Sequence, residues 1–480
     1  MRFVTTRAVQ QPVPAGSFGD RDPLAAPGVS LRTAMLEGLA PDGGLYVPES
    51  IDVWNAGEIS RLRNRTLTEI AYRVLRPYTR PELDATTFEA VVVAALNFPI
   101  PLVEIEPGIY ALELFHGPTL AFKDVGARTM ARLMASLDSG DQPLTVLAAT
   151  SGDTGSAVAH AFHAVPHTRV VVLYPEGRVS PTQEAQLTMF NSEKGNVRAY
   201  AVAGSFDDCH RLTKEAFADV DLRKRVRLTS ANSVNMGRLL PQMVYYFHAL
   251  AQAAHKSSAK EIVICTPSGN FGNLTAGLFG KHAGLPVARF VAATNANDVV
   301  PAYLDTGIFE PRASVQTIAN AMDVGNPSNF ERMRWLYGDD VKAMRRDVVG
   351  SRHSDDEVRA TIKRVYQERG YLMDPHSAIA YLGLTRYFAG RQGQESREGL
   401  DGRERPSSAP GATEGRQEGR EGRIGIFLAT AHPAKFSEIV EPILGHPIET
   451  PKPLADALAQ PRHVLKINAS SDAVRRTLES

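Results

Sequence analysis

The sequence predicts an α/β protein with two units built on largely parallel sheets, preceded by an N-terminal segment of a different kind. Its 480 residues are too many for one simple core, so length alone argues for two or three packed units. From residue 140 onward, short β-branched runs, turns rich in Gly, Ser or Asn, and helix-period segments repeat in that order. Several runs are almost wholly apolar, as expected for strands buried on both faces. The repeat therefore predicts parallel strands with helices on both faces of the sheet.

The first hundred residues lack this repeat. Helical stretches are expected at 58–76 and 81–97, and we assign 1–100 to a separate helical or mixed segment. Residues 140–240 are assigned to a smaller, mobile unit. Residues 101–139 together with 241–480 are assigned to a larger unit.

The strands expected in these units share the β-branched or apolar character described above. They lie at 144–148, 169–173, 197–203, 226–229, 261–265, 287–292 and 423–428. Capping signals mark two helix starts. Ser180 with Gln183 forms a capping box around a first-turn proline, Pro181, and Ser205 with Asp208 repeats the signal.

Residues 391–423 differ in composition from the rest of the larger unit. They are rich in Gly, Arg and Glu and contain no aromatic residue, Ile, Val or Met. Such a segment cannot bury enough apolar surface to order itself. We predict a disordered surface insertion, and a docking tail for a partner is the alternative interpretation.

The composition of the chain argues against several classes of function. The 53 basic and 53 acidic side chains give no net charge, so the basic excess typical of nucleic-acid binding is missing. Cys209 and Cys265 are too few for a disulfide framework and lack the spacing of a zinc site, so no metal is expected. Neither a signal peptide nor a membrane-spanning run is found. We expect a cytoplasmic monomer or homodimer that acts on a small molecule, without nucleic-acid or membrane partners.

A lysine lies at the expected start of a helix. The run 113–124 passes through the turn at Gly117 and Pro118 into a helical segment that begins near Lys123. The positive end of the helix dipole disfavours an ammonium there and lowers the pKa of the amine. An amine that loses its proton easily is what an imine-forming lysine requires. For a lysine taken alone, a solvated surface charge is the alternative.

Two turns that follow buried strands suit anions. Residues 149–156, which lead from the strand at 144–148 into a helix at 157–164, are small and expose backbone N–H groups at the helix N-terminus. Residues 266–275 contain two glycines and two asparagines in the same setting. Neither G-x-x-x-x-G-K-[ST] nor G-x-G-x-x-G occurs at the second turn, which argues against a nucleotide. Any single turn of this kind can be purely structural, but the two turns and the lysine together indicate a phosphate-bearing cofactor and a carboxylate-bearing substrate.

A hydroxyl marks the end of the last buried strand. Thr430 lies at the carboxyl end of the strand expected at 423–428, where ligands of open α/β sheets collect. A helix cap for the segment that starts at Pro433 is the alternative for this residue.

Taken together, these segments resemble the threonine synthase family, whose members are pyridoxal-5'-phosphate (PLP) enzymes of fold type II, the fold of the tryptophan synthase β subunit. The resemblance runs through nearly the whole chain. Residues 30–48 are similar to the N-terminal signature of the family, and 116–124 to its cofactor-lysine motif, which is the most specific match. The insertion at 391–423 has no counterpart in the family pattern. The resemblance implies a carbon–oxygen lyase that converts O-phospho-L-homoserine and water to L-threonine and phosphate.

The resemblance also implies residue roles. Lys123 would hold PLP, Thr430 would face the pyridine nitrogen, and Asp153, where shorter family members often have Asn, would lie near the 3'-oxygen. The turn implied to bind the cofactor phosphate consists of Gly269, Asn270, Phe271, Gly272 and Asn273. The residues implied to bind substrate are Thr150, Ser151, Gly152, Thr154, Asn232, Ser233, Arg238 and His116.

Alternatives stay open for Arg238 and His116. An arginine binds phosphate through paired hydrogen bonds, which suits Arg238 to the substrate phosphate, but a pair with a surface carboxylate is the alternative. His116 is either a polar gate or a packed ring. The loop 323–329 looks like another family loop, without an assigned chemistry.

Two other functions are alternatives to this one. A threonine dehydratase or a cysteine synthase shares the fold but needs no site for a second phosphate. A non-catalytic homologue would use the same turns to bind an anion, and Lys123 argues against it because a binding protein has no need of an imine.

Overall fold

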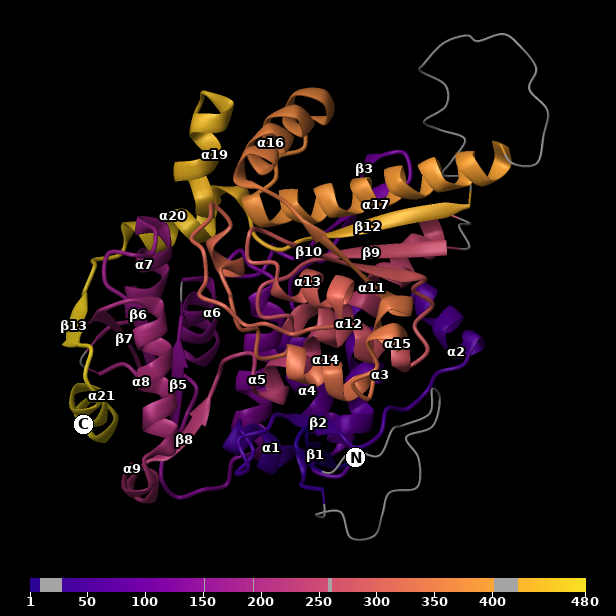
Figure 1. The fold of residues 1–480 in the computed structure, drawn as a ribbon. Coiled ribbons are helices and arrows are strands. Elements are labelled where there is room, and N and C mark those ends of the chain that lie inside the picture. Colours follow the sequence, from indigo (N-terminus) through magenta and orange to yellow (C-terminus); the bar gives the residue numbers. More distant parts are fainter. Residues whose placement is uncertain (9–27, 151, 193, 258–260, 401–421) are drawn as a thin grey trace.

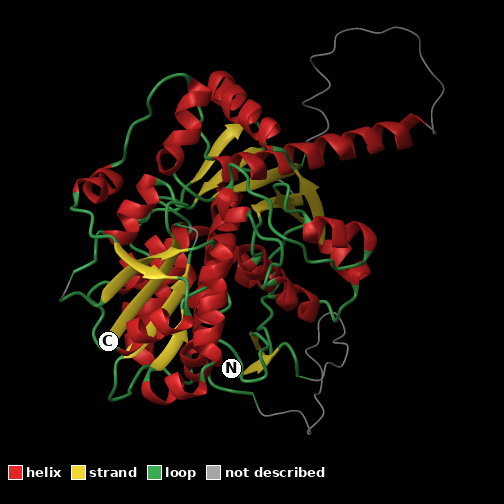
Figure 2. Ribbon diagram, turned by 60° about the vertical axis from the view of Figure 1, so that its left-hand side comes forward, coloured by secondary structure: helices red, strands yellow, loops and turns green. Residues whose placement is uncertain are grey.

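The computed structural model describes residues 1–8, 28–150, 152–192, 194–257, 261–400 and 422–480, without the side chains of 391–400. Its two larger sheets lie apart from each other, as Figure 2 shows. A third, two-stranded antiparallel sheet pairs β1 (Phe3–Thr5) with β2 (Tyr46–Pro48). Within the described residues, no helix is both long and apolar enough to cross a membrane.

The larger sheet has six strands in the order β11-β10-β9-β12-β4-β3. All neighbours are parallel except β3, which runs antiparallel to β4. Its strands are β3 (Leu102–Glu106), β4 (Ile109–Glu113), β9 (Glu261–Pro267), β10 (Arg289–Thr294), β11 (Val348–Arg352) and β12 (Arg423–Ala429). Helices α16 (Asp355–Arg369) and α17 (Pro375–Leu400) cover one side of it (Figure 1).

The smaller sheet has five strands, all parallel, in the order β13-β7-β6-β5-β8. Its strands are β5 (Leu144–Ala149), β6 (Thr168–Pro175), β7 (Val197–Ala203), β8 (Arg227–Ser230) and β13 (Leu465–Asn468). Every residue of β5 is buried, as a strand covered on both faces must be. The α/β class with parallel-rich sheets is therefore confirmed.

The remaining helices form an N-terminal group, a group around the small sheet and a group around the large sheet. The first is α1 (Leu31–Glu37), α2 (Ala56–Ser60), α3 (Leu67–Thr79) and α4 (Ala85–Ala95). The second is α6 (Asp153–Phe162), α7 (Pro181–Thr188), α8 (Phe206–Ala218), α9 (Val220–Arg225), α20 (Lys452–Ala459) and α21 (Ser471–Glu479). The third is α5 (Lys123–Leu137), α10 (Met236–Leu239), α11 (Met243–Lys256), α12 (Gly272–His282), α13 (Val299–Thr306), α14 (Phe330–Leu336), α15 (Val341–Asp347) and α19 (Ser437–Leu444).

The expected elements compare well with the observed ones. Each of the seven expected strands is present, with ends shifted by at most two residues. The capping boxes at Ser180 and Ser205 both form. The helix expected at 58–76 is divided, because Thr66 and Glu69 form a further capping box that starts α3.

The structure differs from the expected organisation in two places. The insertion expected at 391–423 begins inside α17, which continues to Leu400, and ends at the first residue of β12; residues 401–421 lie outside the described ranges. The end of the chain was assigned to the larger unit, but β13 pairs with β7 of the smaller sheet. Val474 and Leu478 of α21 are buried in the core of that sheet, which holds the C-terminal segment there.

Candidate active site

A cleft of about 1470 Å³ lies where the carboxyl ends of strands from both sheets meet. Ala149 ends β5 and Pro267 ends β9, and Thr430 follows directly after β12; all three residues line the cleft. Residues of the N-terminal segment, among them Arg7 and Leu45, complete its wall. The carboxyl ends of parallel strands are where open α/β sheets bind ligands.

Lys123 is the first residue of α5, as expected. The turn before it is held by Asp124, whose carboxylate accepts hydrogen bonds from the backbone N–H and the hydroxyl of Thr119, both at 2.8 Å. Burial lowers the pKa of Lys123 to about 8, opposed by the attraction of Asp153 and reinforced by repulsion from Lys435 and Arg238. The Lys123 amine therefore loses its proton at a lower pH than an ordinary lysine does.

Thr430 is fixed beside the lysine loop by main-chain hydrogen bonds. Its carbonyl accepts from the N–H of Phe122 at 2.8 Å, and the N–H of His432 donates to Leu120 O at 3.0 Å. The N–H of Thr430 donates to Ser377 Oγ at 3.2 Å. The loop that ends at Lys123 and the segment that follows β12 thus form one rigid wall of the cleft.

The turn 269–273 has the features of a phosphate site. Helix α12 begins at Gly272, after Phe271 in the left-handed region (φ 59°), and no side chain among the described residues caps its N-terminus. A Cβ at Gly269 would lie 2.7 Å from Met322 Cα, so no side chain fits there. Asn273 Oδ1 accepts from the hydroxyls of Tyr245 (2.5 Å) and Tyr246 (2.6 Å). Its buried Nδ2 has no partner in the described part of the chain. The uncapped N-terminus of α12 and the unpartnered Nδ2 of Asn273 therefore offer hydrogen-bond donors that suit the phosphate of PLP.

The hydrogen bonds of Thr150 and the backbone conformation of Gly152 shape the turn that leads into α6. Thr150 Oγ accepts from the N–H groups of Gly152 (2.9 Å) and Gly155 (2.8 Å). Gly152 has φ 137°, and a Cβ there would lie 2.4 Å from the side chain of Gln183. Helix α6 begins at Asp153, four residues before the expected start. Thr154 lines the cleft, and Ser151 lies outside the described residues.

Arg238 is buried, with 4% of its surface exposed, and it lines the cleft. Its Nη1 donates to Ala231 O at 2.9 Å, while its Nε has no partner among the described residues. Burial lowers the pKa of Arg238 to about 10, against the attraction of Asp124. Nearby, Asn232 Oδ1 is also buried without a partner within the described ranges. The alternative of a surface ion pair is wrong, because the guanidinium is not at the surface.

The loop 323–329 connects the two candidate phosphate sites. Asn329 Nδ2 donates to Ser233 Oγ at 3.2 Å, and Ser233 Oγ also accepts from Asn270 Nδ2 at 2.7 Å. The N–H of Ser328 donates to Asn270 Oδ1 at 2.5 Å. Arg332, fully buried, donates to Asn329 Oδ1 at 2.6 Å and to Ser233 O at 3.1 Å. This loop therefore fixes the position of Ser233 relative to the turn 269–273.

Most of the predicted site residues line the one cleft. They are Lys123, Thr150, Asp153, Thr154, Asn232, Ser233, Arg238, Gly269, Asn270, Phe271, Gly272, Asn273 and Thr430. Gly152 and His116 are not among its lining residues. His116 Nε2 instead lies 2.7 Å from Glu113 Oε2, and its ring packs against that of Phe115. The His116 side chain is exposed and lies outside the cleft lining, so neither the polar gate nor the packed ring is confirmed.

Two buried residues near the site were not predicted. Lys435, fully buried, places Nζ 2.9 Å from Asp153 Oδ1. His376 lines the cleft; its Nε2 accepts from the N–H of Ala321 at 3.2 Å, so Nδ1 carries the proton that it donates to Asp374 at 2.6 Å. The sequence around Asp374 has the signal of a helix start, but burial of a lysine or a histidine depends on tertiary packing.

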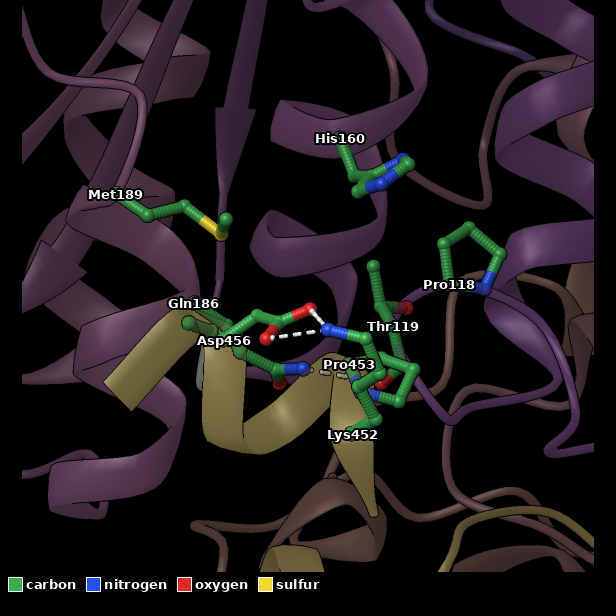
Figure 3. Close-up of a pocket in the computed structure, with 9 residues that line it drawn as sticks. Pro118, Thr119, His160, Gln186, Met189, Lys452, Pro453 and Asp456 are labelled. Carbon is green, nitrogen blue, oxygen red and sulfur yellow. Dashed lines mark hydrogen bonds and ion pairs between the residues drawn. The ribbon is translucent and has the colours of Figure 1, made fainter. Parts of the chain in front are cut away.

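A second, smaller pocket of about 350 Å³ lies behind Thr119, between α6, α7 and α20. Figure 3 shows Gln186 and Thr119 meeting at this pocket, where Gln186 Nε2 donates to Thr119 O at 3.4 Å. Lys452 and Asp456, which form an ion pair, are among the residues that line it (Figure 3). Across the described ranges, no group of three or more His, Cys, Asp or Glu side chains is placed to hold a metal ion.

Comparison with known proteins agrees with this geometry. The model of the family described as "Pyridoxal-phosphate dependent enzyme" matches residues 94–398. The models "Threonine synthase N terminus" and "Threonine synthase, C-terminal" match residues 21–96 and 408–478. Together with the partly buried lysine at the start of α5, the fold defines a PLP-dependent enzyme of fold type II.

Individual relatives show which family of PLP-dependent enzymes the chain resembles. The chain is 42% identical to the threonine synthase of Serratia marcescens over 89% of this chain and 91% of the relative. It is 44% identical to that of Haemophilus influenzae, with the same coverage. The crystal structure of PLP-bound threonine synthase from Brucella melitensis superposes with a TM-score of 0.82 at 34% identity, covering 100% of this chain and 99% of that one. The chain belongs to the threonine synthase family and is a PLP-dependent lyase.

Proposed function

We propose that this chain converts O-phospho-L-homoserine and water to L-threonine and inorganic phosphate, with PLP held on Lys123. The observation that carries the proposal is one cleft that holds two candidate phosphate sites together with a lysine of lowered pKa. One site is the uncapped N-terminus of α12, and the other is the buried Arg238 with its unpartnered Nε. A substrate that brings its own phosphate needs the second site.

The residues that would hold PLP all line the cleft, and their individual roles are those that the family resemblance implies. The turn 269–273 would bind its phosphate through free N–H groups. Thr430 would face the pyridine nitrogen, and Asp153 would lie near the 3'-oxygen. When bound, PLP supplies the electron sink that stabilises negative charge at the substrate carbons.

The substrate would be held at both ends. Arg238, with Asn232 and Ser233, would bind its phosphate, since a guanidinium matches phosphate oxygens. The turn 150–154, at the N-terminus of α6, would bind its carboxylate. Gly152 shapes the backbone through its positive φ. For Ser151, which lies outside the described residues, the substrate-binding role rests on the sequence alone.

Lys123 would move the protons. Its amine, which is neutral in a sizeable fraction near pH 8, would take a proton from Cα and return protons along the substrate chain. Phosphate leaves from Cγ and water adds at Cβ, so that phosphohomoserine and water give threonine and phosphate. The phosphate that Arg238 retains would accept a proton from the attacking water.

Closure of the cleft would protect these steps from bulk water. Asp153 and Thr150 belong to elements around the smaller sheet, whereas Lys123, the turn 269–273 and Thr430 lie on the elements of the larger sheet. Movement of the smaller unit toward the larger one would therefore complete the site and exclude water. The cytoplasm is the proposed compartment for this chemistry, with a monomer or a homodimer as the assembly.

The test is turnover with O-phospho-L-homoserine, followed by both threonine and inorganic phosphate. The proposal predicts equal amounts of the two products. A 2-oxo acid formed from threonine or serine, without use of phosphohomoserine, would favour a dehydratase instead. Binding of the substrate without any product would favour a non-catalytic homologue.

A further inference from the structure

Two lysines share one buried carboxylate in the site. Lys435 Nζ lies 2.9 Å from Asp153 Oδ1, within hydrogen-bond distance, while Lys123 Nζ lies 4.0 Å from Asp153 Oδ2. Lys435 and Asp153 are 0% and 4% exposed. A buried ammonium needs a close anion and further acceptors to offset its lost hydration, and Asp153 is that anion for Lys435.

Lys435 also contacts the loop that leads to Lys123. Its Nζ donates to Thr119 O at 2.7 Å. Thr119 in turn binds Asp124, the residue that follows Lys123. Lys435 lies just after β12, and Asp153 begins α6 beside the smaller sheet, so the ion pair joins elements from the two sheets.

We propose that Lys435 is a positioning residue that neutralises Asp153 and thereby keeps Lys123 out of a strong ion pair, so that the Lys123 amine stays available to PLP and substrate. This inference rests on the roles proposed above for Lys123 and Asp153. Without Lys435, the nearest cation to the carboxylate would be Lys123 itself. An amine paired with a buried carboxylate holds its proton more tightly and is a poorer nucleophile and base.

The electrostatics of the site agree with this geometry. Although burial alone would raise it, the pKa of Asp153 is held well below its usual range by Lys435 and then by Lys123. Burial lowers the pKa of Lys123 to about 8, and Asp153 and Lys435 act on it with opposite signs. The charged or titratable groups that face these three side chains from neighbouring elements are Arg238, His376, Asp124, Glu438 and His432.

The test uses the rate at which the full-length apoenzyme captures PLP, measured by absorbance as a function of pH. Capture forms the C–N bond between the PLP aldehyde carbon and the neutral Lys123 amine, and water leaves. In the wild type, the midpoint of the profile is expected near the Lys123 pKa of about 8. Lys435→Met should move the midpoint upward by about one pH unit or more, which slows capture about tenfold at a pH below it.

Removing the carboxylate should have the opposite effect. Asp153→Asn should move the midpoint downward, and the double variant should return it toward the wild-type value, because the two opposite charges are lost together. The double variant should also unfold at a higher temperature than Lys435→Met, which leaves a buried carboxylate without its close partner. Lys452→Met, at an exposed lysine paired with Asp456, is the matched control and should change neither quantity.

A role limited to the hydrogen bond with Thr119 predicts another pattern. In that case Lys435→Met lowers the unfolding temperature, leaves the midpoint of capture unchanged and is not rescued by Asp153→Asn; this pattern would overturn the proposal. If Lys435→Met does not fold, Asp153→Asn is compared with the double variant instead. The proposal then requires a higher midpoint of PLP capture in the double variant than in Asp153→Asn. Failure of PLP to attach to Lys123 in the wild type would instead contradict the proposed function.

Discussion

The backbone N–H of Phe122 donates to the carbonyl oxygen of Thr430 at 2.8 Å. An isolated antiparallel bridge between Ala121 and Ala431 extends this contact. Because Lys123 follows Phe122 directly, the lysine proposed to carry PLP and the hydroxyl proposed to face its ring are fixed to one another through the main chain. Substitutions at Thr430 therefore change the chemistry next to the pyridine nitrogen with little room for rearrangement.

The first prediction concerns Thr430. A hydroxyl is an uncharged partner that leaves the pyridine nitrogen largely unprotonated, whereas an aspartate would hold a proton there and strengthen the electron sink. Thr430→Asp should keep PLP, accumulate a species that absorbs at long wavelength with substrate, and form threonine more slowly. Thr430→Ser should stay active. Normal turnover of the aspartate variant, with no new absorbing species, would argue against this placement.

The second prediction separates the two phosphate sites. Arg238→Ala should weaken binding of phosphohomoserine far more than binding of PLP, because the cofactor has its own turn at 269–273. The loss should be about 2 kcal/mol or more, as for a buried charged partner. Substrate KM and the PLP dissociation constant measure the two effects. Arg211→Ala, at an exposed arginine of α8, is the control. Equal weakening of both ligands, or of neither, would rule the assignment out.

The third prediction concerns Gly269. A Cβ there would lie 2.7 Å from the backbone of Met322, so Gly269→Ala must displace the turn. PLP should be lost more readily, as measured by its dissociation constant, with a smaller effect on the unfolding temperature of the apoenzyme. Gly280→Ala in α12 is the matched control, because its Cβ would meet Phe247 at an ordinary 3.4 Å. Unchanged retention of PLP in Gly269→Ala would show that the turn does not hold the cofactor.

The fourth prediction concerns the segment between α17 and β12. Replacement of residues 401–421 with a short Gly-Ser linker should leave the unfolding temperature and turnover nearly unchanged. The composition of the segment offers little apolar surface to bury, and loop length affects closure entropy only logarithmically. A large fall in either quantity would show that the segment has a structural or functional role.

Much of the fold follows from sequence patterns that act locally. The seven expected strands appear in the sequence as apolar or β-branched runs, and the starts of two helices follow from the capping residues Ser180 and Ser205. The buried strand β4 of the larger sheet was not expected. The strand β13 was missed, because Leu-Lys-Ile-Asn alternates over only four residues at a sheet edge. Its pairing with β7, more than 250 residues earlier, depends on tertiary contacts that no local pattern encodes.

The site residues likewise fall into those that local sequence patterns predict and those that depend on tertiary packing. Lys123, the two turns and Thr430 stand at the ends of predictable strands and helices, so their convergence in one cleft could be predicted from topology. Lys435 could not be assigned a role, because a lysine in a sequence gives no sign that it will be buried against Asp153. His116 illustrates the reverse case: it belongs to the most specific motif, yet its ring packs beside Phe115 and pairs with Glu113.

Borohydride reduction of the purified protein, followed by peptide mapping, shows directly whether Lys123 holds the cofactor. The partly buried amine at the start of α5, with its pKa lowered to about 8, predicts a yellow protein. Reduction should then place the PLP label on the peptide that contains Lys123, and Lys123→Ala should lose both the colour and the label. A colourless protein after reconstitution with PLP, or a label on another lysine, would contradict the account.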